Sequence, residues 1–294
     1  MRSSTPAPEK AKIALIGCGL MGTGLARLFR SVHWPVSVWD QDVQTLARLC
    51  SDVPGVVAAK DLQGAVQDAD LVIEAVAEQP SIKQALFADL AAHSSSHTLL
   101  ATNSSVIPVA VVTANVSDGD ADRVLGTHFW NPPDLIPLVE VIQGPRTSDA
   151  SILRAIGLLE AAGREPVRVH ADVVPGNRLQ HALWREAMAL VDEGICSPQD
   201  VDRIIKCSFG ARLAVLGPLE NADLVGLELT RQIHEVVLPH LSCATQPAAG
   251  LLNRIAAGHT GIASGSGFYP EWTEARIAAL RAKLAGHLRK AFSR

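Results

Sequence analysis

The stretch that decides the fold is residues 12–22, which read KIALIGCGLMG. Its first half is a short apolar run, which predicts a buried parallel strand over residues 12–17. The glycines that follow match G-x-G-x-x-G, and residues 20–31 place apolar side chains at helical spacing. A strand, a glycine turn and a helix in this order predict the first unit of a dinucleotide-binding α/β sheet.

Each glycine of the turn has a physical role in such a site. Gly17 permits the tight turn, Gly19 lets the backbone approach a pyrophosphate, and Gly22 lets the helix pack closely on the strand. Leu20 and Met21 open the helix, whose first N–H groups would bind the phosphates. The alternative is a glycine turn that holds no ligand.

The residue that selects the cofactor follows the second predicted strand, residues 35–39. Asp40 ends this strand about 20 residues after the glycines, where a carboxylate can accept hydrogen bonds from a ribose diol. The same carboxylate would repel a 2′-phosphate, and no arginine follows directly. The sequence therefore predicts NAD over NADP, with a turn or helix-cap role for Asp40 as the alternative.

Strands and helices alternate until about residue 170, which predicts a parallel, doubly wound sheet. After that point we find no convincing strand before residue 241. The fold class is therefore α/β, with a Rossmann-type doubly wound sheet followed by an all-helical C-terminal domain. The expected divisions are a polar tail (1–10), an NAD-binding domain (11–171) and a helical domain for substrate and dimerisation (172–294). The later strands are expected at 70–76, 98–102, 123–127, 138–142 and 165–169, and the later helices at 150–162, 178–193, 198–207, 220–238 and 272–291.

Composition excludes several classes of protein. The 294 residues suffice for two domains, and 48% hydrophobic with 19% charged residues excludes a disordered chain. A net charge of −4 argues against nucleic-acid binding, and no apolar run is long enough to cross a membrane. The five cysteines have no CxxC spacing and an odd count, which favours free thiols in the cytoplasm and gives no metal motif.

The chemistry is concentrated in residues 101–140. His128 follows a predicted strand and so lies at the carboxyl edge of the sheet, where ligands bind in open α/β folds. An imidazole can take the proton of a hydroxyl group near neutral pH. Glu140 lies within the apolar run 138–142, and a buried acid needs a partner, for which His128 is the candidate. The alternatives are a core histidine and an outward-facing acid.

A set of segments, in this order along the chain, resembles the L-3-hydroxyacyl-CoA dehydrogenase family. The resemblance covers residues 12 to about 270, and its HxxNP and LVE segments are more specific than the glycine motif. It implies a Rossmann domain followed by a helical domain that dimerises, and it implies a place in fatty acid metabolism. The segments are GCGLMG, VWDQ, ADLVIEAVAE, ATNSS, THFWNPP, LVEVI, NRL, EGICSPQDVD, GPLENADLVGL and SGSGFY.

The resemblance also implies roles for single residues. His128 matches the catalytic histidine and Glu140 the glutamate that orients it. Ser105 and Asn177 match residues that contact the substrate oxygen. Four further residues match the family's cofactor-side positions: Glu78, Lys83, Asn103 and Asn131.

One departure from the family concerns the substrate. Members that act on CoA thioesters carry a long helical hairpin after the second strand, as part of a clamp for CoA. Here residues 41–69 leave room for about one helix and a short strand, and contain only two basic residues, Arg48 and Lys60. The HFWNPP and NRLQ segments are also similar to the branch that acts on free hydroxy acids such as gulonate or carnitine. In that case an arginine or lysine should receive the carboxylate, with Arg178, Arg185 and Arg212 as candidates and a surface or interdomain charge as the alternative for each.

The sequence therefore predicts NAD-dependent oxidation of a 3-hydroxy acid or a 3-hydroxyacyl-CoA to the 3-keto compound. One alternative is a non-catalytic, crystallin-like NAD-binding protein, against which the intact set of site residues argues. Another is a 3-hydroxyisobutyrate-type dehydrogenase, which uses a lysine base, whereas residues 171–190 contain no lysine. We expect a small-molecule substrate and a homodimer formed through residues 215–219 and 222–227.

Overall fold

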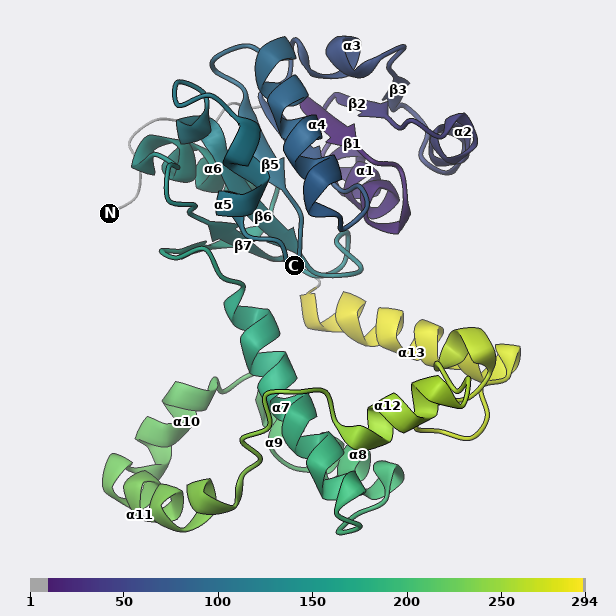
Figure 1. Cartoon of the computed structure of the whole chain (residues 1–294), viewed down its shortest axis with the longest axis vertical. Helices are drawn as coiled ribbons and strands as arrows, with labels where there is room; N and C mark the ends of the chain where they lie inside the picture. Colours follow the sequence, from purple (N-terminus) through teal and green to yellow (C-terminus); the bar gives the residue numbers. More distant parts are fainter. Residues whose placement is uncertain (1–9, 293–294) are drawn as a thin grey trace. The chain divides into compact units, whose positions relative to one another are not determined.

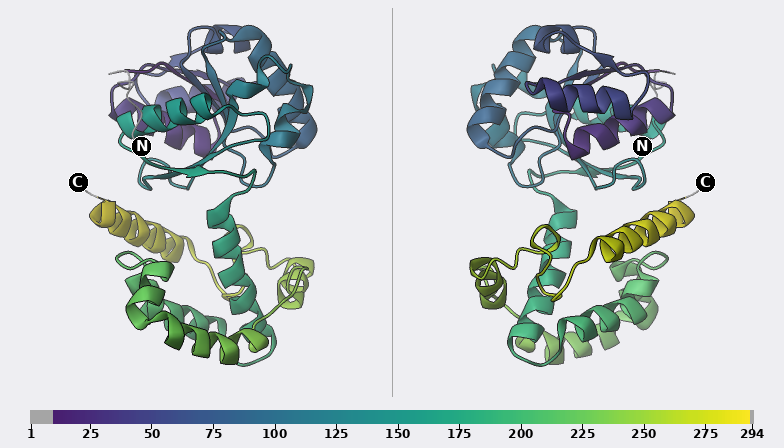
Figure 2. Two further views of the ribbon diagram at one scale, coloured as in Figure 1. Left: turned by 90° about the vertical axis from the view of Figure 1, so that its left-hand side faces the viewer. Right: turned by 90° about the vertical axis from the view of Figure 1, so that its right-hand side faces the viewer.

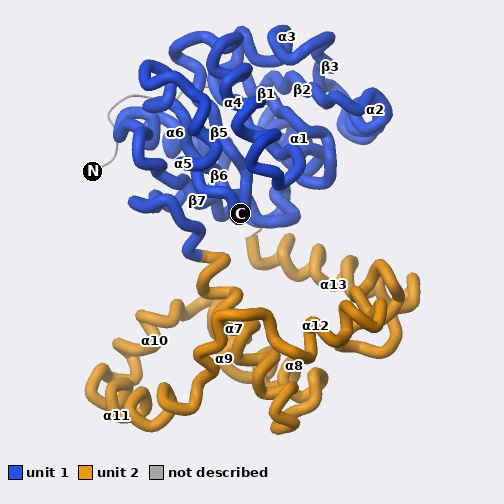
Figure 3. Tube along the Cα trace, in the orientation of Figure 1, with its two compact units in different colours: residues 1–175, 294 blue, residues 176–293 orange. Residues whose placement is uncertain are grey.

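The computed structural model describes residues 10–292 and divides the chain into two compact units after Pro175 (Figure 3). The first unit contains an eight-stranded sheet with helices, and the second is helical (Figure 1). The predicted fold class is therefore confirmed. The polar tail expected at residues 1–10 lies outside the described residues except for Lys10.

The sheet of the first unit has the strand order β3-β2-β1-β4-β5-β6-β7-β8. Pairing is parallel from β3 to β6, antiparallel between β6 and β7, and parallel again between β7 and β8. The strands are β1 (Ile13–Ile16), β2 (Val36–Trp39), β3 (Val57–Ala58), β4 (Leu71–Glu74), β5 (Leu99–Thr102), β6 (Val124–Phe129), β7 (Leu138–Ile142) and β8 (Glu165–Val169).

The antiparallel pair corrects the expectation of an all-parallel sheet. A loop without a helix, residues 130–137, joins β6 to β7, whereas a parallel neighbour needs a crossover of a dozen or more residues. The hairpin sets His128 on β6 directly opposite Glu140 on β7. The strand also runs to Phe129, so His128 lies within its carboxyl end rather than after it.

The sheet is covered on both faces, as Figure 2 shows. Along β1, Ile13 and Leu15 pack into one apolar cluster, and Ala14 and Ile16 pack into the other, as the alternation of strand side chains requires. The first cluster is covered by α1 (Leu20–Ser31), α2 (Val43–Asp52) and α6 (Asp149–Ala161). The second is covered by α3 (Leu62–Val66), α4 (Pro80–His93) and α5 (Val109–Val112).

The second unit is built from helices joined by turns. The single helix expected at 220–238 is divided by Gly226, whose φ of +101° is left-handed and ends the first segment. The helix α12 was not predicted. The helices are α7 (Pro175–Asp192), α8 (Pro198–Cys207), α9 (Phe209–Arg212), α10 (Pro218–Val225), α11 (Leu227–Val237), α12 (Ala249–Ala256) and α13 (Glu274–Phe292).

All five cysteines are free thiols, as their number and spacing predicted. Within residues 10–292, no helix combines the length and apolar character that a membrane crossing requires. The same residues contain no cluster of three His, Cys, Asp or Glu side chains that could hold a metal ion.

Candidate active site

The glycine turn between β1 and α1 has the geometry that a pyrophosphate needs. Gly17 has φ +99°, and a Cβ there would lie 2.6 Å from the carbonyl oxygen of Ala75. A Cβ on Gly22 would lie 1.9 Å from the carbonyl oxygen of Gly17, so the helix packs against the turn itself. A Cβ on Gly19 would meet nothing within 4 Å. Open space above Gly19, at the start of a helix without a side-chain cap, fits the phosphates of a dinucleotide.

Asp40 lies beside this turn, just after β2. Its Oδ2 accepts a hydrogen bond from the Cys18 N–H at 2.7 Å, and its Oδ1 accepts one from the Asp42 N–H at 2.8 Å. The neighbouring Asp42 is the residue that caps α2, through the Gln44 N–H at 2.9 Å. Asp42, not Asp40, therefore caps α2, whereas the bond from the Asp42 N–H gives Asp40 the turn role that was the alternative. Its partly exposed carboxylate also fits a ribose diol. Burial, with smaller effects of the Asp40 charge and of Cys50, raises the pKa of the Cys18 thiol to about 12.

Three of the predicted catalytic residues form a chain of hydrogen bonds at the carboxyl end of the sheet. His128 Nδ1 lies 2.8 Å from Glu140 Oε2, and His128 Nε2 lies 3.1 Å from Ser105 Oγ. His128 and Glu140 are each 4% exposed, whereas Ser105 lies in an exposed loop after β5. Glu140 fixes the tautomer, because its carboxylate accepts the Nδ1 proton and leaves the Nε2 lone pair directed at Ser105. The arrangement can accept a proton at Nε2.

Trp130 completes the surroundings of the histidine, and the sequence analysis gave it no role. Its indole N–H donates to Glu140 Oε2 at 3.3 Å, the oxygen that also faces His128. The indole and imidazole rings meet edge to face, with centroids 5.4 Å apart. The sequence feature that could have identified Trp130 is its place in the HFWNPP segment, two residues after the histidine.

The two asparagines assigned to the cofactor side have different surroundings. Asn103 is buried, and its Oδ1 accepts a hydrogen bond from the Phe129 N–H at 3.0 Å, which ties the end of β5 to β6. Asn131 is exposed in the loop after β6. That loop packs on α1, since a Cβ on Gly24 would lie 2.6 Å from Pro133 Cγ. The loop that follows the histidine therefore lies against the helix of the glycine turn.

Glu78 and Lys83, which the resemblance assigned to the cofactor side, lie close together in the structure. The Lys83 side chain is 1% exposed, and its ammonium lies 2.5 Å from Glu74 Oε1 and 3.6 Å from Glu78 Oε2. The role of Lys83 on the cofactor side stays a prediction. Glu74 was not predicted as a residue of the site. It is nevertheless a buried acid within the apolar run 70–76, and an acid within an apolar run is the pattern that identified Glu140. Asn177 lies near the start of α7, in the second unit.

Two family models match almost the whole length beyond residue 50. The NAD-binding domain of 3-hydroxyacyl-CoA dehydrogenase matches residues 51–173, and the C-terminal domain of 3-hydroxyacyl-CoA dehydrogenase matches residues 175–271. A curated relative, 5-formyl-3-hydroxy-2-methylpyridine 4-carboxylate 5-dehydrogenase of Mesorhizobium japonicum, is 32% identical over 92% of this chain and 95% of its own.

Solved structures agree with the family models. A crystal structure of 5-formyl-3-hydroxy-2-methylpyridine 4-carboxylic acid 5-dehydrogenase, described as an NAD+-dependent dismutase, superimposes with a TM-score of 0.89 over 97% of this chain and 99% of that chain, at 32% identity. The 3-hydroxyacyl-CoA dehydrogenase of Archaeoglobus fulgidus gives a TM-score of 0.72 at 28% identity, over 95% of this chain and 98% of that chain. The chain therefore belongs to the 3-hydroxyacyl-CoA dehydrogenase family and is an NAD-dependent oxidoreductase that acts on a hydroxyl group.

Proposed function

We propose that His128 is the base that takes the proton of the substrate hydroxyl group as that group becomes a carbonyl. The observation that carries the proposal is the hydrogen-bonded chain Ser105–His128–Glu140 at the carboxyl edge of the sheet. The Nε2 lone pair faces Ser105, so a substrate hydroxyl that hydrogen-bonds to Ser105 Oγ would lie within reach of the base. When bound at the glycine turn, NAD supplies the acceptor for the hydride.

In this proposal Glu140 holds the imidazole and stabilises its positive charge once the proton has moved. The attraction between a carboxylate and an imidazolium is stronger in a buried site than in bulk water. Asn177 is assigned a hydrogen bond to the substrate oxygen, on the strength of its match to the family's N-R-L segment.

We further infer that the substrate is a small hydroxy acid that is not linked to CoA. Residues 41–69 fold into α2, of 10 residues, the two-residue strand β3 and α3, of five residues. A helix of that length spans about 15 Å, too short for a long projecting hairpin. The similarity to a dehydrogenase named for a pyridine carboxylate supports the same inference. The carboxylate would be received by an arginine of the second unit, with Arg178, Arg185 and Arg212 as candidates.

We also propose that two copies of the chain associate through their helical units. The segments expected at the contact are strongly exposed in the single chain: Val215 is 89% exposed, Leu219 81% and Leu224 75%. Apolar side chains exposed together are typical of a surface that a partner covers.

The base assignment is tested by His128→Ala, measured as NADH formation with a substrate that the wild type oxidises. We expect kcat to fall by about 10³-fold, the range of general-base catalysis. The Kd for NADH, measured by its fluorescence, should stay within about twofold because His128 lies outside the glycine turn. The exposed His97→Ala is the matched control and should retain full activity. A His128→Ala enzyme with near wild-type kcat would contradict the proposal.

A further inference from the structure

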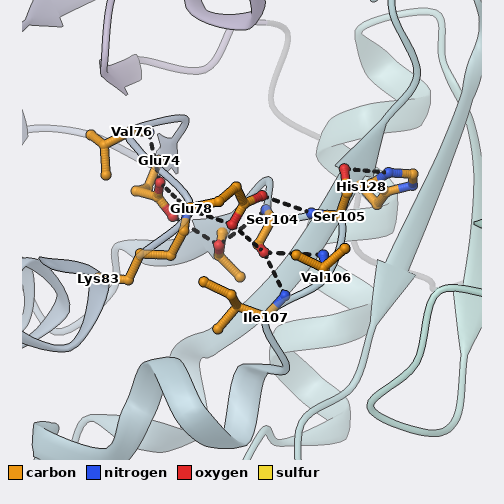
Figure 4. Close-up of polar contacts among 10 residues, drawn as sticks. Glu74, Val76, Glu78, Lys83, Ser104, Ser105, Val106, Ile107 and His128 are labelled. Atoms are coloured by element: carbon orange, nitrogen blue, oxygen red, sulfur yellow. Dashed lines mark hydrogen bonds and ion pairs between the residues drawn. The ribbon is translucent and has the colours of Figure 1, made fainter. Parts of the chain in front are cut away.

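The imidazole of the proposed base has a partner at each ring nitrogen. Its Nε2 lies 3.1 Å from Ser105 Oγ, as Figure 4 shows, and its Nδ1 lies 2.8 Å from Glu140 Oε2. Glu140 is buried, and a buried carboxylate is stable as an anion only where it is paired or hydrogen-bonded. The position of the His128 ring therefore depends on the groups that hold the Glu140 carboxylate.

Trp130 supplies a second donor to the same carboxylate oxygen. Its indole N–H lies 3.3 Å from Glu140 Oε2, so this oxygen accepts from an indole and from an imidazole. The two donors differ in one respect, because the imidazole gains and loses a proton whereas the indole N–H is a donor at every working pH. Trp130 can therefore hold Glu140 in both protonation states of His128.

The hairpin of β6 and β7 explains why these side chains meet. His128 lies opposite Glu140 in the register of the two antiparallel strands. Trp130 comes directly after β6, two residues beyond His128, and side chains two residues apart in an extended chain point to the same face. Phe129, between them, packs into the apolar cluster on the other face. The indole therefore lies on the face that holds His128 and Glu140.

The indole ring also contacts the imidazole ring itself. The two rings meet edge to face, with centroids 5.4 Å apart and planes inclined at 72°, a favourable arrangement for an aromatic pair. Rotation of the imidazole would break this contact together with the bonds at Nδ1 and Nε2. Trp130 thus contacts both members of the pair, the base through its ring and the acid through its N–H group.

We propose that Trp130 is a positioning residue, which holds the Glu140 carboxylate through its indole N–H and the imidazole of His128 through its ring. The inference rests on the proposed function, in which His128 is the base and Glu140 orients it. Loss of the indole N–H should then slow the reaction only while Glu140 is present to accept it.

A double-mutant cycle between Trp130→Phe and Glu140→Ala tests the part assigned to the N–H group. Trp130→Phe keeps an aromatic ring at a partly buried position, so the variant should fold, which circular dichroism checks. We expect kcat for NADH formation to fall about tenfold, the size of effect expected for one hydrogen bond to a charged group, and KM to change by less than about twofold. In the Glu140→Ala background, Trp130→Phe should lower kcat further by less than about twofold.

A second substitution tests the part assigned to the ring. Trp130→Leu removes both the N–H group and the aromatic ring, so it should lower kcat more than Trp130→Phe does. In the Glu140→Ala background it should still lower kcat, because the contact between the two rings does not involve Glu140. The matched control is Trp272→Phe, which makes the same exchange beside Tyr269 in the second unit and should match the wild type.

The outcomes separate this inference from the proposed function. Full activity in Trp130→Phe would overturn the inference, and so would losses that multiply in the Trp130→Phe/Glu140→Ala variant. Equal kcat in Trp130→Phe and Trp130→Leu would overturn the part assigned to the ring. A rise of about tenfold in KM or in the Kd for NADH, with unchanged kcat, would make Trp130 a ligand of the substrate or cofactor and would also overturn it. Full activity in Glu140→Ala would remove both the inference and the role proposed for Glu140, whereas the role of His128 is decided by His128→Ala.

Discussion

The two units of the chain differ in how far they bury their apolar side chains. The first unit encloses them in two clusters, one on each face of its sheet. In the second unit, among residues 176–292, Val201 is the one buried side chain, and helices α10, α11 and α13 expose leucines throughout. Helices gain most of their stability by burying an apolar face. The first unit therefore completes its core within itself, whereas the helices of the second unit leave apolar side chains exposed.

This difference separates the proposed chemistry from the proposed association. The glycine turn, Asp40 and the Ser105–His128–Glu140 chain all lie in the first unit. The segments proposed to meet a second copy lie in the second unit. Variants of these first-unit residues should therefore change the chemistry and leave the association intact, and variants of the exposed second-unit segments should do the reverse.

Among the variants that compare the two units, the largest effect is expected in the first unit, from Glu140→Gln. Glutamine can still accept the Nδ1 proton of His128 but carries no charge to stabilise the imidazolium. We expect kcat to fall about 100-fold, within the range of general-base catalysis, as measured by NADH formation. The association state, measured by light scattering, should not change. Glu160→Gln, in the same unit, is the matched control, and loss of association in Glu140→Gln would undermine the separation of the two properties.

A smaller effect is expected at Asp40, where the cofactor choice is proposed to lie. Asp40→Asn keeps the size of the side chain but removes the charge that repels a 2′-phosphate. The ratio of kcat/KM for NAD to that for NADP should fall about tenfold, equivalent to about 1.4 kcal/mol. Initial rates with both cofactors measure this ratio. An unchanged ratio would show that another residue selects the cofactor.

In the second unit, Leu219→Glu and Leu224→Glu place charges on the surface proposed to meet a second copy. Because both side chains are exposed in the single chain, neither change should disturb its fold. The mass in solution should halve relative to the wild type, because burying an unpaired charge at a contact is costly. The exposed Glu235→Gln on α11 serves as the control. A wild-type protein that is already a single chain would refute the dimer.

A last comparison, which involves no change in activity or association, concerns the reactivity of thiols in the two units. Burial raises the pKa of the Cys18 thiol to about 12, so at pH 8 its reactive thiolate is about one part in 10⁴. Iodoacetamide should therefore label the exposed Cys207 and Cys243 long before Cys18, as read by mass spectrometry. Equal rates for Cys18 and Cys243 would contradict the closed packing around the glycine turn.

Sequence patterns predicted most of the first unit because local signals and long-range packing agree there. The glycine turn and the apolar run 138–142 both placed strands correctly. The direction of β7 was missed because it depends on the length of the loop 130–137, and an apolar run carries no direction. The division at Gly226 was missed because the apolar residues continue at helical spacing on both sides of it.

In the candidate site, the contact between two side chains on different strands or helices was predicted only where one of them was a buried acid that needed a partner. His128 and Glu140 were paired because a buried acid needs a counterpart. The same reasoning applied to Glu74 would have identified Lys83 as its partner, nine residues along. The contact of Trp130 with Glu140 arises from the hairpin and has no signal in local spacing.

The central claim, a hydroxy-acid dehydrogenase without a CoA clamp, is tested most directly by one specificity ratio. NADH formation by the wild-type enzyme is compared between 3-hydroxybutyryl-CoA and a panel of free hydroxy acids, including hydroxymethyl pyridine carboxylates. We expect the best free acid to have a kcat/KM at least about tenfold above that of the CoA ester, a difference of about 1.4 kcal/mol. A CoA ester that turns over best would contradict it.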